Sequence, residues 1–155
     1  MNRRYPAAVV LALLLAPFPL QAQSADQEKE AVYAVVQKFF QGFNAKDSTA
    51  MKSTLFSDVK LFTTATNQQG VPVARAEDAA GLISAITGAT AKLDERISNP
   101  VISVADGLAT VWVDYEFYAD EKYSHCGVDV FMLVKTADGW KISTLADTRR
   151  KSCGK

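Results

Sequence analysis

The sequence predicts an α+β domain in which N-terminal helices pack on a strongly curved antiparallel or mixed sheet, giving a cone-shaped barrel with a pocket. Helical periodicity is confined to residues 24–87, and strand-like alternation dominates from residue 92 onward. Near the C-terminus, two runs rich in β-branched and aromatic residues, 127–135 and 140–149, flank an Asp138-Gly139 turn. That pattern is a strong hairpin signal.

Residues 1–22 are predicted to be a secretory signal peptide. Arg3 and Arg4 precede an apolar run at 7–15, and small residues follow at 16–24. A run of nine residues is short for a bilayer span. We therefore expect cleavage after Ala22, with Ser24 as the alternative site, rather than a retained anchor. Residues 23–155 are expected to form one periplasmic or secreted domain without stable membrane insertion.

Charge and composition argue against several classes of partner. The full chain has 17 basic and 17 acidic residues, and removing residues 1–22 takes away two arginines, leaving 15 against 17. This weakly acidic balance does not favour nucleic acid. The chain has no glycine-rich phosphate loop, and its single histidine and two cysteines make no metal-ligand spacing. We expect neither a cofactor nor a metal.

Three helices are predicted in the first half. Ser24 and Gln27 fit a capping box for the first one, and Asp47 is a good N-cap for a short second helix ending at 55–56. A third is expected over 75–87, with Gly88 as its C-cap. The first helix carries an aromatic stripe, for which core packing is the simpler interpretation and a ligand wall the alternative. The stripe consists of Val32, Val35, Val36, Phe39, Phe40 and Phe43.

The strands are expected at 59–63, 92–97, 101–104 and 108–118, before the final hairpin. A polar loop is expected at 64–73 and another at 119–124. Asn99-Pro100 interrupts the second and third runs, which indicates an edge strand or a bulge because proline lacks a ladder donor. In the strand 108–118, alternation places Tyr115 and Phe117 on one face and Trp112 on the other.

The final hairpin fixes a register if its loop is 137–139 with Gly139 in the left-handed conformation. Phe131 then lies opposite Leu145, and Asp129 lies opposite Asp147. Cys126 faces residue 150, so Cys153 must curl back to form a disulfide with it. An even cysteine count in an oxidising compartment favours that bridge, which would contribute roughly 3–4 kcal/mol on the chain-entropy model.

Three segments resemble nuclear transport factor 2-like (SnoaL-like) proteins. Residues 40–47 (FQGFNAKD) with 55–59 (LFSDV) are similar to the opening of these proteins, and 138–142 (DGWKI) to their closing hairpin. The resemblance covers nearly all of residues 23–155. It implies a cone-shaped α+β barrel, often dimeric through the outer sheet face. It also implies a superfamily that includes ketosteroid isomerases, dehydratases, polyketide cyclases, ring-dioxygenase subunits and transport factors.

Strand parity supplies the candidate site residues, because no catalytic motif of these isomerases or dehydratases aligns with the chain. Asp129 and Asp147 share a face, where two carboxylates in a pocket would act as an acid–base pair. The alternative is pairing with Arg149 or Arg150, or a solvated face. His125 is a third catalytic candidate, with a surface role as its alternative. The predicted ligand-binding residues are aromatic: Phe39, Phe43, Tyr115, Phe117 and Phe131.

The sequence therefore supports three hypotheses about function. The first is a periplasmic homodimer that binds a small, partly apolar molecule. The second is a cofactor-free lyase or isomerase that uses the pocket carboxylates. The third is an accessory interaction module.

Overall fold

The computed structural model of the chain describes residues 25–153, so the predicted signal peptide lies outside the described residues. The chain forms three helices and six strands in this part. Their order is α1 (Ala25–Ala45), α2 (Ser48–Thr54), β1 (Leu55–Thr66), β2 (Pro72–Glu77), α3 (Ala79–Gly88), β3 (Leu93–Ala105), β4 (Leu108–Ala119), β5 (Lys122–Thr136) and β6 (Gly139–Arg149).

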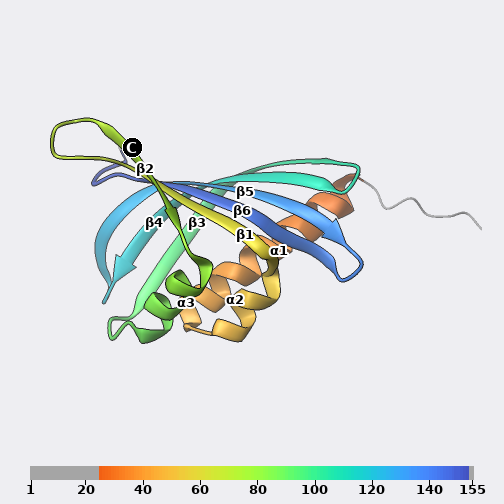
Figure 1. Ribbon diagram of the computed structural model, residues 1–155, viewed down its shortest axis with the longest axis horizontal. Coiled ribbons are helices and arrows are strands. Elements are labelled where there is room, and N and C mark those ends of the chain that lie inside the picture. The colour runs from red at the N-terminus through yellow and green to blue at the C-terminus, as the bar shows by residue number, and fades with distance from the viewer. Residues whose placement is uncertain (1–24, 154–155) are drawn as a thin grey trace, which may run out of the picture.

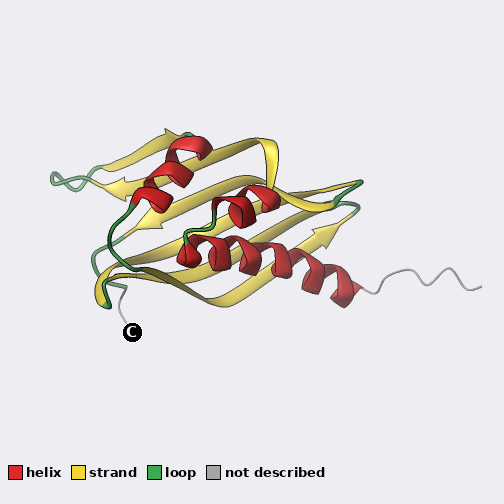
Figure 2. Cartoon of the chain, turned by 90° about the horizontal axis from the view of Figure 1, so that it is seen from below, coloured by secondary structure: helices red, strands yellow, loops and turns green. Residues whose placement is uncertain are grey.

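The strands form one mixed sheet in the order β2-β1-β6-β5-β4-β3. Only the β1–β6 pair is parallel; the other neighbours are antiparallel. The three helices lie together under the concave face of this curved sheet (Figure 1, Figure 2). The predicted α+β cone is therefore confirmed. The sheet does not close on itself, and β2 and β3 are its edges.

The hydrophobic core lies between α1 and the concave face. The α1 stripe supplies Val32, Val36 and Phe39, each at most 2% exposed, so core packing accounts for most of the stripe. Alternate residues of the central strands complete the core: Val111 and Val113 of β4, Phe131 and Leu133 of β5, and Ile142 of β6. The core thus joins the first helix to the last three strands.

The helix boundaries follow the capping residues. Asp47 accepts hydrogen bonds from the backbone N–H groups of Thr49 and Ala50 at 2.9 and 3.0 Å, so its predicted N-cap role is confirmed. Asp78 caps α3 by accepting from Gly81 N at 2.9 Å. The predicted helix at 75–87 was therefore wrong at its start, since residues 75–77 belong to β2. Gly88 ends α3, and the C-cap is Ala89.

Two predicted loops are strands joined by short turns. The expected loop at 64–73 is a β1–β2 hairpin with its turn at 67–71, and it projects beyond the body of the molecule (Figure 1). The expected loop at 119–124 is a tight turn in which Asp120 and Glu121 have positive φ. In both places polar side chains suggested a loop, although the backbone continues the sheet. The irregularity at Asn99-Pro100 in edge strand β3 was predicted correctly.

The predicted pairing of the final hairpin is confirmed at the site. Asp129 lies opposite Asp147, Phe131 opposite Leu145, and Cys126 bridges to Arg150. The predicted three-residue loop is wrong, because Thr136 pairs with Gly139. Near the turn the register is offset by one residue, and an irregularity between Met132 and Leu133 removes the offset. Cys126 and Cys153 form the predicted disulfide, with Cα atoms 6.1 Å apart.

Among residues 25–153, no helix is both long and apolar enough to cross a membrane.

Candidate functional site

A cavity lies between α1 and the concave face of the sheet, beneath the β1–β2 hairpin. The enclosed part of the cavity has room for a few water molecules, whose centres can occupy a volume of about 60 Å³. Its empty space rises to about 500 Å³ when the open mouth is included. The apolar wall comes mainly from Phe39, Phe40, Phe43, Leu61, Leu82 and Leu145. The polar wall comes from Thr63, Glu77, Glu95, Tyr115, His125, Asp129, Asp147 and Arg149.

Asp129 is the most deeply buried charged group of this cavity. The residue is 3% exposed, and its Oδ2 atom has no hydrogen-bond partner among residues 25–153. Burial raises the pKa of its carboxyl well above the usual range, and the neighbouring Glu95 and Asp147 carboxyls raise it further. The raised pKa favours the protonated form of Asp129. Its O–H group can donate a hydrogen bond to a ligand in the cavity.

Glu95, on edge strand β3, brings a second acid into the cavity. Burial, followed by the charge of Asp147, raises the pKa of Glu95 to about 8. Asn44, at the end of α1, holds this part of β3. Its amide donates to the Glu95 carbonyl at 3.0 Å, and its Oδ1 accepts from the Glu95 N–H at 2.8 Å. The sequence analysis did not select Glu95 or Asn44.

Asp147 is held differently from the other two acids. Thr63 donates a hydrogen bond to its Oδ1, and Arg149 Nε lies 3.2 Å from its Oδ2. The alternative of arginine pairing therefore holds for Asp147, whose side chain is 16% exposed. It does not hold for Asp129, which faces Asp147 across β5 and β6 and forms no ion pair within the described part of the chain. The cavity thus combines the arginine-paired carboxylate of Asp147 and the carboxyl of Glu77 with two acids, Glu95 and Asp129, whose pKa values are raised.

His125 and Tyr115 form the wall toward the C-terminal end of the sheet. Burial, and then the charge of Arg149, lowers the pKa of His125, so its ring is neutral at pH 7. The hydroxyl of Tyr115 donates to the Thr148 carbonyl at 2.9 Å, and burial raises its pKa. Gly127 makes this contact possible. A Cβ there would overlap the Thr148 carbonyl oxygen and lie 2.7 Å from Tyr115 Cε1.

The structure brings most of the predicted site residues together. Asp129, Asp147, His125 and the aromatic residues Phe39, Phe43 and Tyr115 all line the cavity. Phe117 and Phe131 lie behind the wall: Phe117 packs on His125, with ring centroids 4.9 Å apart, and Phe131 is completely buried. No group of three or more His, Cys, Asp or Glu residues between 25 and 153 is arranged to hold a metal ion.

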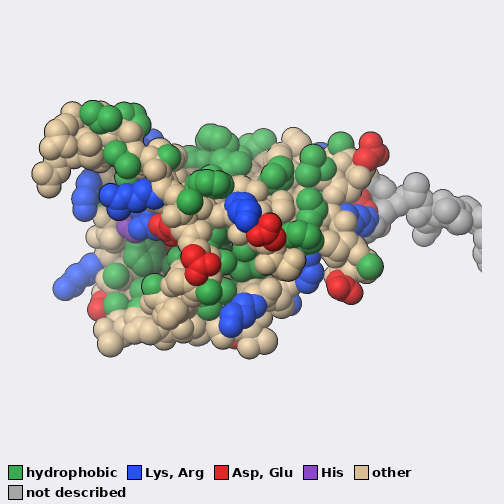
Figure 3. All heavy atoms as spheres, viewed as in Figure 1, with side chains coloured by type: hydrophobic (Ala, Val, Ile, Leu, Met, Phe, Trp, Pro, Cys, Tyr) green, Lys and Arg blue, Asp and Glu red, His purple; other side chains and the backbone are tan. Residues whose placement is uncertain are grey.

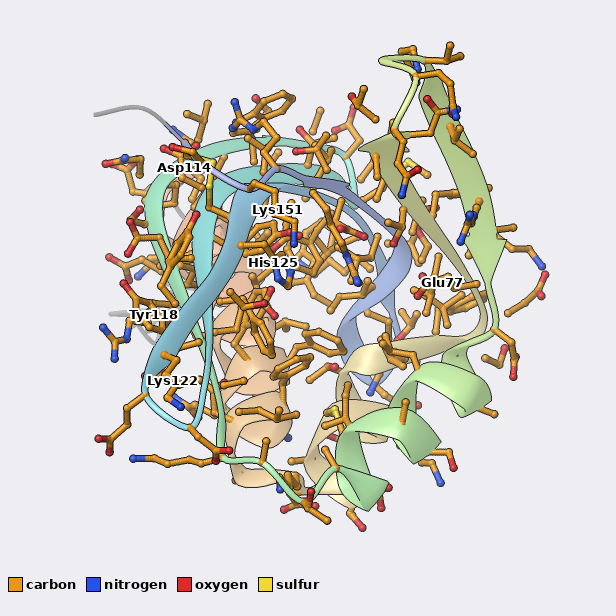
Figure 4. The ribbon with its side chains drawn as sticks, turned by 90° about the vertical axis from the view of Figure 1, so that its left-hand side faces the viewer. Glu77, Asp114, Tyr118, Lys122, His125 and Lys151 are labelled. Carbon is orange, nitrogen blue, oxygen red and sulfur yellow. A yellow bond between two sulfur atoms is a disulfide. The ribbon has the colours of Figure 1, made fainter. Side chains whose placement is uncertain are left out.

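Figure 4 looks along the sheet toward the mouth of the cavity. His125 and Lys151 lie near each other in the centre of the view, and Glu77 lies on the opposite wall. Asp114 and Tyr118 lie at the outside of the molecule in the same view. Asp114 and Tyr118 of β4 therefore lie away from the side of the sheet that carries His125.

A family model described as "Putative lumazine-binding" matches residues 27–145 of the chain. The chain belongs to this family. The family lies within the nuclear transport factor 2-like (SnoaL-like) superfamily, which confirms the resemblance found in residues 40–59 and 138–142. A search of curated proteins found no match.

Solved structures share the fold of this family member at low sequence identity. An NTF2-like protein of unknown function from Shewanella baltica is 18% identical, with 83% of this chain and 98% of that chain covered and a TM-score of 0.61. A protein from Streptomyces avermitilis described as a "putative dehydratase" is 12% identical, with 83% and 100% covered and a TM-score of 0.62.

The beta subunit of a "putative aromatic-ring-hydroxylating dioxygenase" from Novosphingobium aromaticivorans is 13% identical. The alignment covers 83% of this chain and 93% of that chain, with a TM-score of 0.65. At sequence identities this low, the structural similarity establishes a common fold alone. The function has to be argued from the residues of the cavity.

Proposed function

We propose that the chain is an exported domain that binds a small, partly apolar molecule in the cavity between α1 and the sheet. The observation that carries this proposal is Asp129, whose buried Oδ2 atom has no partner within the described residues. An unpaired buried polar group costs roughly 1–3 kcal/mol, so it favours a ligand that supplies the missing hydrogen bond. Phe39 and Phe43 offer apolar contact on the opposite wall.

The description of the family supports the same class of ligand. Lumazine is a small bicyclic molecule with several carbonyl and ring-nitrogen acceptors. Such acceptors suit the protonated forms of Asp129 and Glu95, which the raised pKa values favour and which can each donate a hydrogen bond. The expected ligand is therefore an acceptor-rich ring system.

Native mass spectrometry of protein purified from a periplasmic extract tests the proposal. We expect a reproducible extra mass on the folded protein, and loss of that mass in Asp129→Leu. Asp114→Leu is the matched control, because Asp114 is bonded to Asn99 outside the cavity. A ligand-free wild-type protein, or a mass retained in Asp129→Leu, would contradict this site. The same spectra should show residues 23–155 alone, with the two cysteines oxidised.

A second candidate function is cofactor-free acid–base catalysis, as in a lyase or isomerase. The observation in its favour is a titratable group near neutral pH: Glu95, with a pKa of about 8, lies in the same cavity as the paired carboxylate Asp147. Asp147 would accept a proton from a ligand C–H, and Asp129 or Glu95 would donate one to its carbonyl. His125 could relay protons at the mouth.

Deuterium exchange separates catalysis from binding. The co-purified compound, incubated with the protein in D₂O, should gain deuterium at an acidic C–H position if the cavity is catalytic. Asp147→Asn should stop this exchange while the compound still binds. Binding without any exchange in the wild-type protein would leave a binding domain as the function.

We also propose a homodimer through the convex face of the sheet. Successive register partners form an apolar row across five strands: Phe62, Ala146, Val130, Trp112 and Val101. Phe62, Trp112 and Val101 are 42%, 50% and 64% exposed, and a second copy could cover them. Sedimentation at micromolar concentration should show a dimer for the wild type and for Val71→Lys at the hairpin tip. It should show a monomer for Trp112→Lys, and a wild-type monomer would contradict the proposal.

A further inference from the structure

Basic side chains gather at the mouth of the cavity, where β6 leaves the sheet. Arg149, Arg150 and Lys151 follow one another in the chain. Together with His125, Ala65 and Thr66 they line a depression that has no acidic residue in its wall. Figure 3 shows this gathering of basic side chains beside the histidine at one end of the molecule. His125 and Arg149 also line the inner cavity, so the basic depression opens onto the proposed ligand site.

The cations of the mouth have few competing partners, although Arg150 also lines a second hollow that includes Asp114 and Glu116. Neither Arg150 nor Lys151 forms an ion pair within residues 25–153. The backbone around them is nevertheless fixed. Arg150 pairs with Cys126 through two backbone hydrogen bonds, and the Lys151 carbonyl accepts from the Tyr123 hydroxyl at 3.3 Å. The disulfide from Cys126 to Cys153 ties the segment down two residues later.

The interior does not oppose the entry of an anion. The raised pKa values of Glu95 and Asp129 favour their neutral forms, Asp147 is paired with Arg149, and Glu77 on the opposite wall also interacts with the charge of Arg149. The neutral ring of His125 adds no charge at the mouth. The positive charge therefore lies at the entrance, and hydrogen-bond donors lie deeper in the cavity. A molecule that fits both parts carries an anionic group at one end and an acceptor at the other.

We propose that the ligand is an amphipathic organic acid whose carboxylate lies against Arg150 and Lys151 while its apolar body enters between Phe39 and Phe43. This inference rests on the proposed ligand-binding function. From Arg149 to the level of Asp147 and Asp129 is two residues of strand, about 7 Å. A phenyl ring on a short alkyl acid spans that length, and an oxygen on the far side of the ring would reach the neutral acids.

A pair of probes that differ only in charge tests the inference. 3-(4-Hydroxyphenyl)propanoate and its neutral amide are titrated into the oxidised mature protein at pH 7 and low salt, with ¹⁵N NMR shifts as the readout. We expect both to shift amides around the cavity, and the acid to bind about tenfold more tightly, as one charge-assisted contact would give. Raising the salt to about 0.5 M should reduce the difference, because the mouth is exposed.

The double variant Arg150→Gln/Lys151→Gln should remove most of the preference and leave the affinity for the amide unchanged. The control, Lys38→Gln/Lys52→Gln, removes two exposed charges from α1 and α2 and should keep the preference. Equal binding of acid and amide by the wild type would overturn the anionic ligand but keep the cavity as a binding site. A preference lost equally in both double variants would overturn the mouth as its source. If neither probe shifts the cavity amides at millimolar concentration, the proposed function fails as well.

Discussion

Acidic side chains usually lie on the surface of a protein and large apolar ones inside it, and the two faces of this sheet depart from that rule in opposite ways. On the concave face, Asp129 is 3% exposed and is surrounded by core residues. One residue farther along β5, Val130 points to the convex face and belongs to a row with Trp112, which is 50% exposed. An acid is buried on one side, and a large aromatic ring is exposed on the other.

Both departures lower the stability of the isolated chain, and this is what makes them informative. Exposed single apolar residues are common in proteins, whereas a buried unpaired acid or a continuous apolar row is uncommon. Each would be compensated by the molecule proposed to cover it: a small ligand on the concave face, a second copy on the convex face. If this comparison is right, substitutions on the two faces of one strand should have opposite or unequal effects.

The largest expected effect is the pH dependence of stability. Glu95 has a pKa of about 8 in the folded chain and an ordinary value of 4.5, so the folded state binds more protons between these values. Stability is therefore highest near pH 5, falls as the pH rises to about 8 and then levels off, and Asp129 acts in the same direction. The free energy of unfolding measured in urea should be roughly 3–5 kcal/mol higher at pH 5 than at pH 9, because a shift of one pKa unit corresponds to about 1.4 kcal/mol.

Variants of two glutamates on opposite faces of the sheet test which group causes this pH dependence. Glu95→Gln should remove a large part of the pH dependence and leave the part that Asp129 contributes. Glu116→Gln, on the convex side of β4 where the Tyr118 hydroxyl donates to the carboxylate at 2.9 Å, should leave it unchanged. A wild-type protein that is as stable at pH 9 as at pH 5 would mean that Glu95 ionises freely and faces solvent.

A methyl group at Gly127 is the next largest perturbation. Gly127→Ala would press its Cβ into the Thr148 carbonyl and the Tyr115 ring, so we expect a loss of about 3 kcal/mol in the free energy of unfolding. Gly88→Ala is the control, since a Cβ at Gly88 meets nothing within 4 Å. It should be neutral or slightly stabilising. Equal stabilities of the two variants in urea would show that β5 and β6 separate readily at the site.

The pairing of Asp129 with Asp147 could be predicted because it is local. Hairpin turn chemistry sets the register of the two strands that follow it. The prediction of the turn was wrong by one residue, and the irregularity between Met132 and Leu133 happens to restore the expected register before the site is reached. The correct pair therefore followed from the right kind of argument, although the structure contains two deviations where the prediction assumed none.

Glu95 could not be found in the same way, because its face depends on an irregularity. The β3–β4 turn pairs Ala105 with Leu108, and an unbroken register would place Glu95 opposite Tyr118 on the convex face. The shift between Ser98 and Val101 pairs Glu95 with Phe117 instead, which turns its side chain into the cavity. Pro100 signalled the irregularity, but its size in residues decides the face, and the sequence does not show that size.

Replacing Asp129 tests whether the concave acid is costly to the chain. Asp129→Leu removes an unpaired buried carboxyl and adds apolar contact, so we expect the free energy of unfolding at pH 7 to rise by about 2 kcal/mol. Asp114→Leu, on the convex side of β4, loses only its bond from Asn99 at 2.9 Å and should change stability by less than about 0.5 kcal/mol. A destabilised Asp129→Leu would show that the carboxyl is satisfied in the folded protein.

The smallest effect concerns two tyrosines of β4 that lie on opposite faces. Tyr115→Phe deletes a buried hydroxyl that donates to the Thr148 carbonyl, which should cost about 1 kcal/mol and leave that carbonyl unpaired. Tyr118→Phe deletes a half-buried hydroxyl that donates to Glu116, and water can replace it, so its cost should stay below about 0.5 kcal/mol. Parallel urea titrations of both variants measure the difference. Equal costs would mean that water reaches Tyr115 as easily as Tyr118, and the concave face would then be solvated rather than a closed site.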